Sequence, residues 1–308
     1  MKKFLAQLCI VPLPFALAAA AISWAAYRVE IKAVEREFML PAGIVAAVVG
    51  DSRAETTFDP EELPFLQNFG KSAMPLGVTL QKARMIAEAN PALKMMVIDI
   101  WPKPFFENVD KPFGSDGLAV PKGIALMELA TRRCMPPFGD GFEIRFKDDV
   151  LLPGLKRMLG VKKKKKGKGR NPIIGKFAKN HKFITDLMSA DSTLKPPSSP
   201  EMLPSTPTAG EIALEDLIAW LAERNIKVVL TTTPLLWYEN RYSPEARQYF
   251  GRRMEEIAAA HGATWLNWID EFQDDMGLWA DGCHLNDIGA GRLSREKRSE
   301  LEAILCAP

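Results

Sequence analysis

The sequence predicts an α/β protein built on a parallel sheet with helices over both faces. Three short apolar runs rich in β-branched residues are typical of strands buried on both faces: GIVAAVVG (43–50), MMVIDI (95–100) and KVVLTTT (227–233). Patterns with helical periodicity separate these runs. Strands that alternate with helices in this way predict parallel pairing.

The N-terminal segment precedes this pattern and predicts a membrane anchor. Residues 4–27 contain no charged side chain, and 24 such residues can span a bilayer. The alanines at 16–21 leave signal cleavage as an alternative. Lys2 and Lys3 favour a cytoplasmic N-terminus, whereas the basic residues after the segment argue against it. Because so short a tail usually stays inside, we expect an uncleaved single-pass anchor in the cytoplasmic membrane, with the body periplasmic or extracellular.

Further elements follow in order along the chain. We expect a short strand at 65–69, a weaker strand at 263–268, and helices at 77–89, 212–224 and 244–261. The domain organisation predicted from these elements is an anchor (1–27), a charged helical stalk (28–42), an α/β domain in two parts (43–104 and 209–308) and an insertion (105–208).

The insertion carries the strongest charge feature of the chain. Lys162–Arg170 holds seven basic side chains, although the formal net charge of all 308 residues is only +2. Such a run binds anionic polymers or lipid headgroups, or it is a solvated linker. No aromatic residue is interleaved with it, which argues against nucleic acid. The insertion should leave the carboxyl side of the 95–100 strand, where ligand crevices form, so it is a candidate lid or substrate-recruiting element.

Ser52 is the first candidate for chemistry, within VVGDSRAETTF (48–58). It follows a predicted buried strand on a turn into a helix, where its hydroxyl could act as a nucleophile or cap the helix. A serine nucleophile also needs a base and a carboxylate that orients the base.

The segment WADGCHLNDIGAGRLS (279–294) offers both groups. Asp281 and His284 lie three residues apart before a predicted helix, so the carboxylate can orient the imidazole or the pair can cap the helix. The chain has only three histidines and no CxxC pair, so we predict no metal and no cofactor. Cys134 could form a disulfide with Cys283 or Cys306.

Together, the two segments resemble the first and last sequence blocks of the SGNH (GDSL-type) hydrolase superfamily. The resemblance runs from 44 to 294 with the insertion unmatched. It implies a flavodoxin-like three-layer α/β/α fold, with Ser52 as nucleophile, His284 as general base and Asp281 as its orienting carboxylate. Asn286 would shape the turn into the final helix. The anchor, the long insertion and the GDSR…FDP…NFG run are similar to the membrane-anchored branch that acylates cell-envelope polymers, the DltD type.

The oxyanion hole matches that superfamily only in part. The Ser52 N–H is one expected donor, and Gly70 or Ala73 in NFGKSAMP (68–75) would supply a second. The third block lacks its usual asparagine, since VIDIWPKPFFENVD (97–110) has none before Asn108, and Lys103 could provide a positive donor instead. Arg53 could hold an anionic substrate group or be a surface arginine.

These observations lead to two expectations for function. The first is a membrane-anchored serine esterase or O-acyltransferase that acts on acyl esters of an envelope glycan or polymer through an acyl-serine intermediate. The second is an inactive scaffold with the same fold that binds envelope polymer.

Overall fold

The structure is a computed structural model, and it describes residues 12–72, 74, 76–102, 105, 152–160, 176–184, 203–236 and 242–307. Its centre is a sheet of five strands, all paired in parallel, in the order β2-β1-β3-β4-β5. The strands are β1 (Ala46–Val49), β2 (Leu66–Asn68), β3 (Met95–Asp99), β4 (Lys227–Thr232) and β5 (Thr264–Asn267). This is the flavodoxin-like order, and it confirms the predicted α/β class with a parallel sheet.

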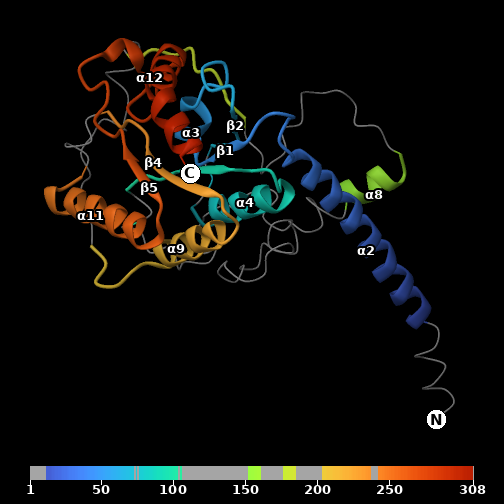
Figure 1. Ribbon diagram of the computed structural model, residues 1–308. Helices are drawn as coiled ribbons and strands as arrows, with labels where there is room; N and C mark the ends of the chain where they lie inside the picture. Colours follow the sequence, from blue (N-terminus) through green and yellow to red (C-terminus); the bar gives the residue numbers. More distant parts are fainter. Residues whose placement is uncertain are drawn as a thin grey trace.

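Seven α-helices occur in the described residues: α2 (Pro12–Glu37), α3 (Ser52–Thr57), α4 (Leu76–Ala89), α8 (Leu152–Met158), α9 (Ala209–Ala222), α11 (Pro244–His261) and α12 (Asp287–Cys306). Helices α4, α9 and α11 cover one face of the sheet, and α3 and α12 cover the other (Figure 1). The molecule therefore has three layers, with the sheet in the middle.

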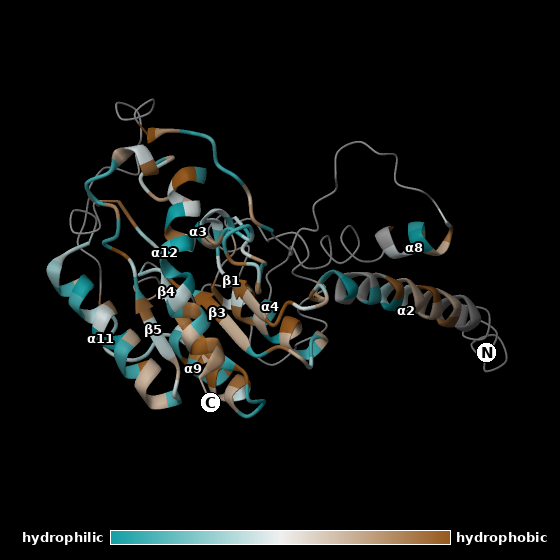
Figure 2. Ribbon diagram, turned by 45° about the horizontal axis from the view of Figure 1, so that its top comes forward, coloured by the Kyte–Doolittle hydropathy of each residue, from teal (hydrophilic) through white to brown (hydrophobic). Residues whose placement is uncertain are grey.

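The strands supply both cores because successive side chains point to opposite faces. Ala47 and Val49 of β1 join the core under α4 and α9, whereas Ala46 and Val48 join the core under α3 and α12. Figure 2 shows hydrophobic residues in the strands and several hydrophilic residues along α11. Burial on both faces explains why the strand sequences are apolar runs rather than alternating patterns.

Local signals determine where two of the helices begin. Thr208 and Glu211 form a reciprocal capping box at the start of α9. Ser243 caps α11, Pro244 follows at its first position, and Gly262 ends the helix with φ 66°.

Helix α2 extends away from the layered body, and α8 packs along it (Figure 1). Within the described part of the chain, no helix is both long enough and apolar enough to cross a membrane. The predicted membrane-spanning helix is therefore not confirmed, and residues 1–11 of the predicted anchor lie outside the described residues. The domain boundaries stay a prediction.

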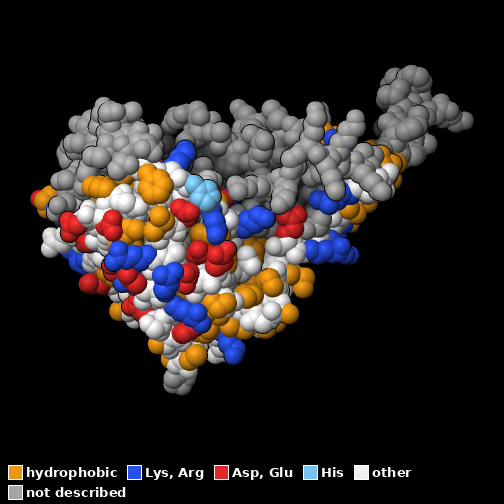
Figure 3. Space-filling model, turned by 90° about the horizontal axis from the view of Figure 1, so that it is seen from above, with side chains coloured by type: hydrophobic (Ala, Val, Ile, Leu, Met, Phe, Trp, Pro, Cys, Tyr) orange, Lys and Arg blue, Asp and Glu red, His pale blue; other side chains and the backbone are white. Residues whose placement is uncertain are grey.

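The face of the molecule seen in Figure 3 carries acidic and basic side chains interspersed with one another. Ion pairs on α12 are of this kind, such as Arg292 with Glu296, Arg298 with Glu302, and Arg295 with Glu62 near α3. Exposed pairs of this type contribute little to stability, because solvent and salt screen the two charges.

Candidate active site

Ser52 is placed by a tight turn between β1 and α3. Gly50 ends the strand, and a Cβ there would lie 2.5 Å from Cβ of Ala54 and 2.9 Å from Cβ of Asp99, so only glycine allows this approach. Asp51 then caps α3, because its side chain accepts from the Arg53 N–H at 2.9 Å. The capping role that was open to Ser52 thus belongs to Asp51, and Ser52 is the first residue of α3.

The structure brings Ser52, His284 and Asp281 together. Oγ of Ser52 lies 2.7 Å from Nε2 of His284, across 232 positions of sequence. Nδ1 of the same ring lies 2.8 and 2.9 Å from the two carboxylate oxygens of Asp281. The hydroxyl, the imidazole and the carboxylate therefore form one hydrogen-bonded chain, which can move a proton from Ser52 to His284.

Asp281 is held by more than the imidazole. Its Oδ1 also accepts from the backbone N–H groups of Cys283, at 2.8 Å, and His284, at 2.9 Å. Burial alone raises the pKa of Asp281, but the hydrogen bond from His284, the charge of His284 and these two N–H groups outweigh burial and lower that pKa below its usual range. The carboxylate is thus ionised and fixed against the ring.

Asn286 supports the loop that carries His284. Its Oδ1 caps α12 by accepting from the Gly289 N–H at 3.0 Å, and its Nδ2 donates to the carbonyl of Gly277 at 2.7 Å. The side chain is fully buried. Both ends of the side-chain amide thus bond to the protein backbone, so Asn286 fixes the loop that carries His284.

The loop after β2 contains Gly70, one of the expected oxyanion donors. Its N–H donates to Oδ1 of Asn68 at 2.7 Å, and a Cβ at Gly70 would lie 2.3 Å from the backbone nitrogen of Glu55 in α3. The glycine therefore permits close packing of this loop on α3, and its N–H is engaged in the protein. Ala73, the other expected donor, lies outside the described residues, as does Lys103.

Two buried charged residues hold the same loop, and the sequence interpretation missed both. Glu55 accepts from the N–H of Ser72 at 2.8 Å and also from the Ser72 hydroxyl. Lys82 of α4 is fully buried, and its Nζ donates to the carbonyl of Phe69 at 2.6 Å. Lys82 lies four residues from Val78 and from Ile86, which are both buried. This position in the apolar stripe of the helix is the signal in the sequence that Lys82 is buried.

Lys82 gives the protein an expected pH dependence of stability. Burial lowers the pKa of Lys82 from 10.5 to about 7, with Lys71 acting in the same direction and Glu55 and Asp51 opposing it. Between pH 7 and 10.5 the unfolded chain keeps this proton while the folded protein releases it, so the free energy of unfolding rises with pH. The expected gain is up to about 5 kcal/mol.

Urea unfolding at pH 7, 8.5 and 10, with wild type and Lys82→Met compared, measures this effect. The methionine variant cannot titrate at this position, so its free energy of unfolding should rise less over the same range. Parallel curves for the two proteins would show that Lys82 does not have the lowered pKa.

Arg53 corrects one of the interpretations of the sequence. The side chain is only 3% exposed, so it is not a surface arginine. The turn at Gly50 directs it over the end of β3, where Nη2 lies 3.8 Å from Oδ2 of Asp99 and the guanidinium carbon lies 4.7 Å from the ring centroid of Trp101.

Asp99 is a further buried charge that the sequence interpretation missed. It ends β3, and its carboxylate accepts from the N–H of Thr233 at 3.0 Å and the hydroxyl of Thr233 at 3.2 Å. Burial raises the pKa of Asp99 to about 6, Asp51 adds to the rise, and Arg53 and Thr233 oppose it. The sequence does carry a signal for this buried charge, because Asp99 is an acidic residue at the end of an apolar strand.

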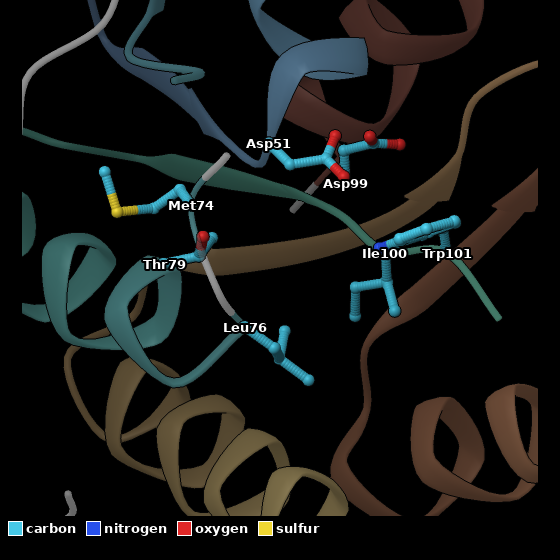
Figure 4. A pocket seen from close by; sticks show the side chains of 7 residues that line it. All are labelled: Asp51, Met74, Leu76, Thr79, Asp99, Ile100 and Trp101. Carbon is cyan, nitrogen blue, oxygen red and sulfur yellow. The ribbon is translucent and has the colours of Figure 1, made fainter. Parts of the chain in front are cut away.

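A small cavity lies beside this cluster, at the carboxyl ends of β1 and β3 and against the start of α4 (Figure 4). Its volume of about 20 Å³ is enough for a water-sized group. Strand order reverses between β1 and β3, and ligands in open α/β sheets bind at such a switch point. Acidic and apolar side chains and one threonine line the cavity: Asp51, Met74, Leu76, Thr79, Asp99, Ile100 and Trp101.

Part of the predicted insertion lies against the helices of the site. In residues 176–184, the Ala178 N–H donates to the carbonyl of Glu55 in α3, and the carbonyl of Asn180 accepts from the N–H of Asp287 in α12, both at 2.9 Å. Ile184 is buried in the core under α12. The basic run Lys162–Arg170 lies outside the described residues.

The cysteines give no support for a predicted disulfide. Cys283 and Cys306 are both reduced thiols, and Cys134 lies outside the described residues. Within the described part of the chain, no group of three or more His, Cys, Asp or Glu side chains could hold a metal ion.

Comparisons with known proteins add little to this geometry. No family model matches the chain, and no curated protein matches it. One similar solved structure is a protein from Streptococcus pneumonia described as a "putative platelet activating factor". It is 12% identical, the alignment covers 94% of this chain and 98% of that one, and the TM-score is 0.45. A likeness this distant carries no argument about function, which must come from the site itself.

Proposed function

We propose that the protein is a serine esterase or O-acyltransferase of the SGNH type. The observation that carries the proposal is the hydrogen-bonded chain from Ser52 through His284 to Asp281 at the carboxyl edge of the sheet. A nucleophile, a base within hydrogen-bond reach and a group that orients the base are the parts that acyl transfer needs.

In the proposed reaction, Oγ of Ser52 forms a bond to the acyl carbonyl carbon while Nε2 of His284 takes its proton. Asp281 stabilises the imidazolium that forms and keeps the ring in the orientation that faces Ser52. The imidazolium then gives its proton to the leaving alcohol, and an acyl-serine remains. Water or a sugar hydroxyl then attacks this ester and loses its proton to His284, and His284 returns that proton to Oγ as the bond between Oγ and the acyl carbon breaks.

The backbone also contributes to the proposed reaction. Ser52 is the first residue of α3, so its N–H has no acceptor within its own helix and can donate to the developing oxyanion.

The substrate and location belong to the same proposal. The apolar N-terminus and the resemblance to the DltD type support a protein held at the membrane that acts on acyl esters of an envelope glycan or polymer. The basic run Lys162–Arg170 would attract an anionic polymer or lipid headgroups to the same surface.

The test is covalent labelling of the full-length protein with a fluorophosphonate, followed by peptide mapping and by an assay of p-nitrophenyl acetate hydrolysis. We expect one labelled peptide that contains Ser52, with hydrolysis lost once it is labelled. Ser243→Ala is the matched control, because the Ser243 hydroxyl caps α11 by accepting from the Ala246 N–H; this variant should label as wild type does. A folded protein that neither labels nor hydrolyses would contradict the proposal and favour the polymer-binding scaffold.

A further inference from the structure

The guanidinium of Arg53 carries donors that the protein does not use. The side chain is 3% exposed, and Nε makes one long hydrogen bond to Oδ1 of Asp51 at 3.4 Å. Nη1 and Nη2 are buried and have no hydrogen-bond acceptor in the described structure, since the contact of Nη2 with Asp99 is 3.8 Å. Buried donors are nearly always paired, so two on one side chain require an explanation.

The position of the guanidinium suggests the explanation. It stacks over Trp101, just beyond β3, at the switch point between β1 and β3. Burial alone lowers the pKa of Arg53, but the negative charges of Asp51 and Asp99 raise it by more, and Tyr242 and Cys283 add to the rise. Arg53 directly follows Ser52 in α3, so its side chain starts one residue from the nucleophile and ends over Asp99 and Trp101.

The charges around Arg53 narrow the kind of oxygen that it can bind. Asp51 and Asp99 bring two carboxylates to one guanidinium, so the cluster has no excess positive charge to hold a permanently anionic group such as phosphate. An oxygen that becomes negative only during the reaction needs directed donors already in place, and fixed N–H groups supply these without reorganisation.

We propose that Arg53 is an oxyanion donor of this site, with its Nη1 and Nη2 N–H groups directed at the acyl oxygen of the substrate. The proposal rests on the acyl-transfer function proposed above. When Oγ of Ser52 adds to the carbonyl carbon, the carbonyl electron pair moves to that oxygen and the proton of Ser52 moves to His284. Arg53 donates hydrogen bonds and transfers no proton, and the bonds weaken again when the alcohol leaves.

This assignment agrees with two other features of the site. The segment after β3 supplies no asparagine before Asn108, and it places Trp101 as a platform under the guanidinium instead. The N–H of Gly70, an expected second donor, is engaged by Asn68. Arg53 and the backbone N–H of Ser52 then act on the same oxygen.

The test compares Arg53→Met with the double variant Arg53→Met/Asp99→Asn in the full-length protein. The single variant leaves Asp99 buried without its cation, and the double variant removes that charge, so stability should be regained in the double variant. We expect kcat for p-nitrophenyl acetate to fall by about 10²–10³-fold in both, with KM changed less than about threefold. Affinity for ethylboronic acid, which forms a tetrahedral anion on serine, should fall by the same factor as kcat.

Arg253→Met is the matched control. Arg253 is a half-buried arginine of α11 paired with Glu211, Glu215 and Glu256, and its loss should lower stability and leave kcat unchanged. Recovery of kcat in the double variant would overturn the proposal, because Arg53 would then only neutralise Asp99. A rise in KM with unchanged kcat would overturn it too. A wild type without Ser52-dependent hydrolysis would overturn the proposed function and this assignment together, whereas an active wild type matched by Arg53→Met would overturn this assignment alone.

Discussion

Ser52→Ala and His284→Ala are each expected to lower kcat for ester hydrolysis by about 10⁶-fold, and the double variant to lower it no further. The 2.7 Å contact between Oγ and Nε2 makes the two side chains one unit, since the hydroxyl is a poor nucleophile unless the imidazole takes its proton. Removing either member therefore removes the whole contribution of the pair. Single-turnover kinetics with p-nitrophenyl acetate measures all three variants.

Stability should change little in these variants, so circular dichroism and thermal unfolding serve as controls. The side chains of His284 and Asp281 remain 23% and 29% exposed, and Ser52 is partly exposed, so no large core contact is lost. If the two single variants lost activity independently, so that the double variant lost the product of the two factors, Ser52 and His284 would not act as a pair.

The sheet and the covering helices could be predicted because each is determined by local sequence. Helix α11 was expected at 244–261 and has those bounds, since serine and proline mark its start and Gly262 marks its end. Helix α9 begins at Ala209, three residues before the expected start at 212, because the capping box of Thr208 and Glu211 begins it. Thr208 and Glu211 are both present in the sequence, but the apolar pattern alone places the start of the helix at 212.

The pairing of Ser52 with His284 could only be expected from the order of the motifs, because 232 residues separate them and the distance depends on how β1 and the segment before α12 meet at one edge of the sheet. The contacts of Arg53 could not be predicted from the sequence for a different reason. A residue in the first turn of a helix can point outward or inward, and here Arg53 points inward, against Asp99 and Trp101. The partners of Lys82 likewise depend on the loop after β2, which has no repeating pattern.

Asp281→Asn tests how far the orientation of the imidazole matters, and we expect kcat to fall by about 10⁴-fold. The carboxylate accepts three N–H bonds, from Cys283, from the His284 backbone and from Nδ1 of the His284 ring. An asparagine can turn its NH₂ group toward the ring, which favours the tautomer with the proton on Nε2 and leaves no base facing Ser52. It also removes the negative charge that stabilises the imidazolium during the reaction.

A second aspartate–histidine pair in the protein, Asp287 with His181, serves as the control. His181 and Asp287 also meet at 2.8 Å, between Nδ1 and Oδ2, but His181 is exposed, and the histidine that contacts Ser52 is His284. Asp287→Asn therefore removes a carboxylate from an aspartate–histidine pair of the same length without touching the nucleophile, and kcat should stay within about twofold of wild type. Equal losses in both variants would mean that the effect arises from general damage to the start of α12 rather than from the orientation of His284.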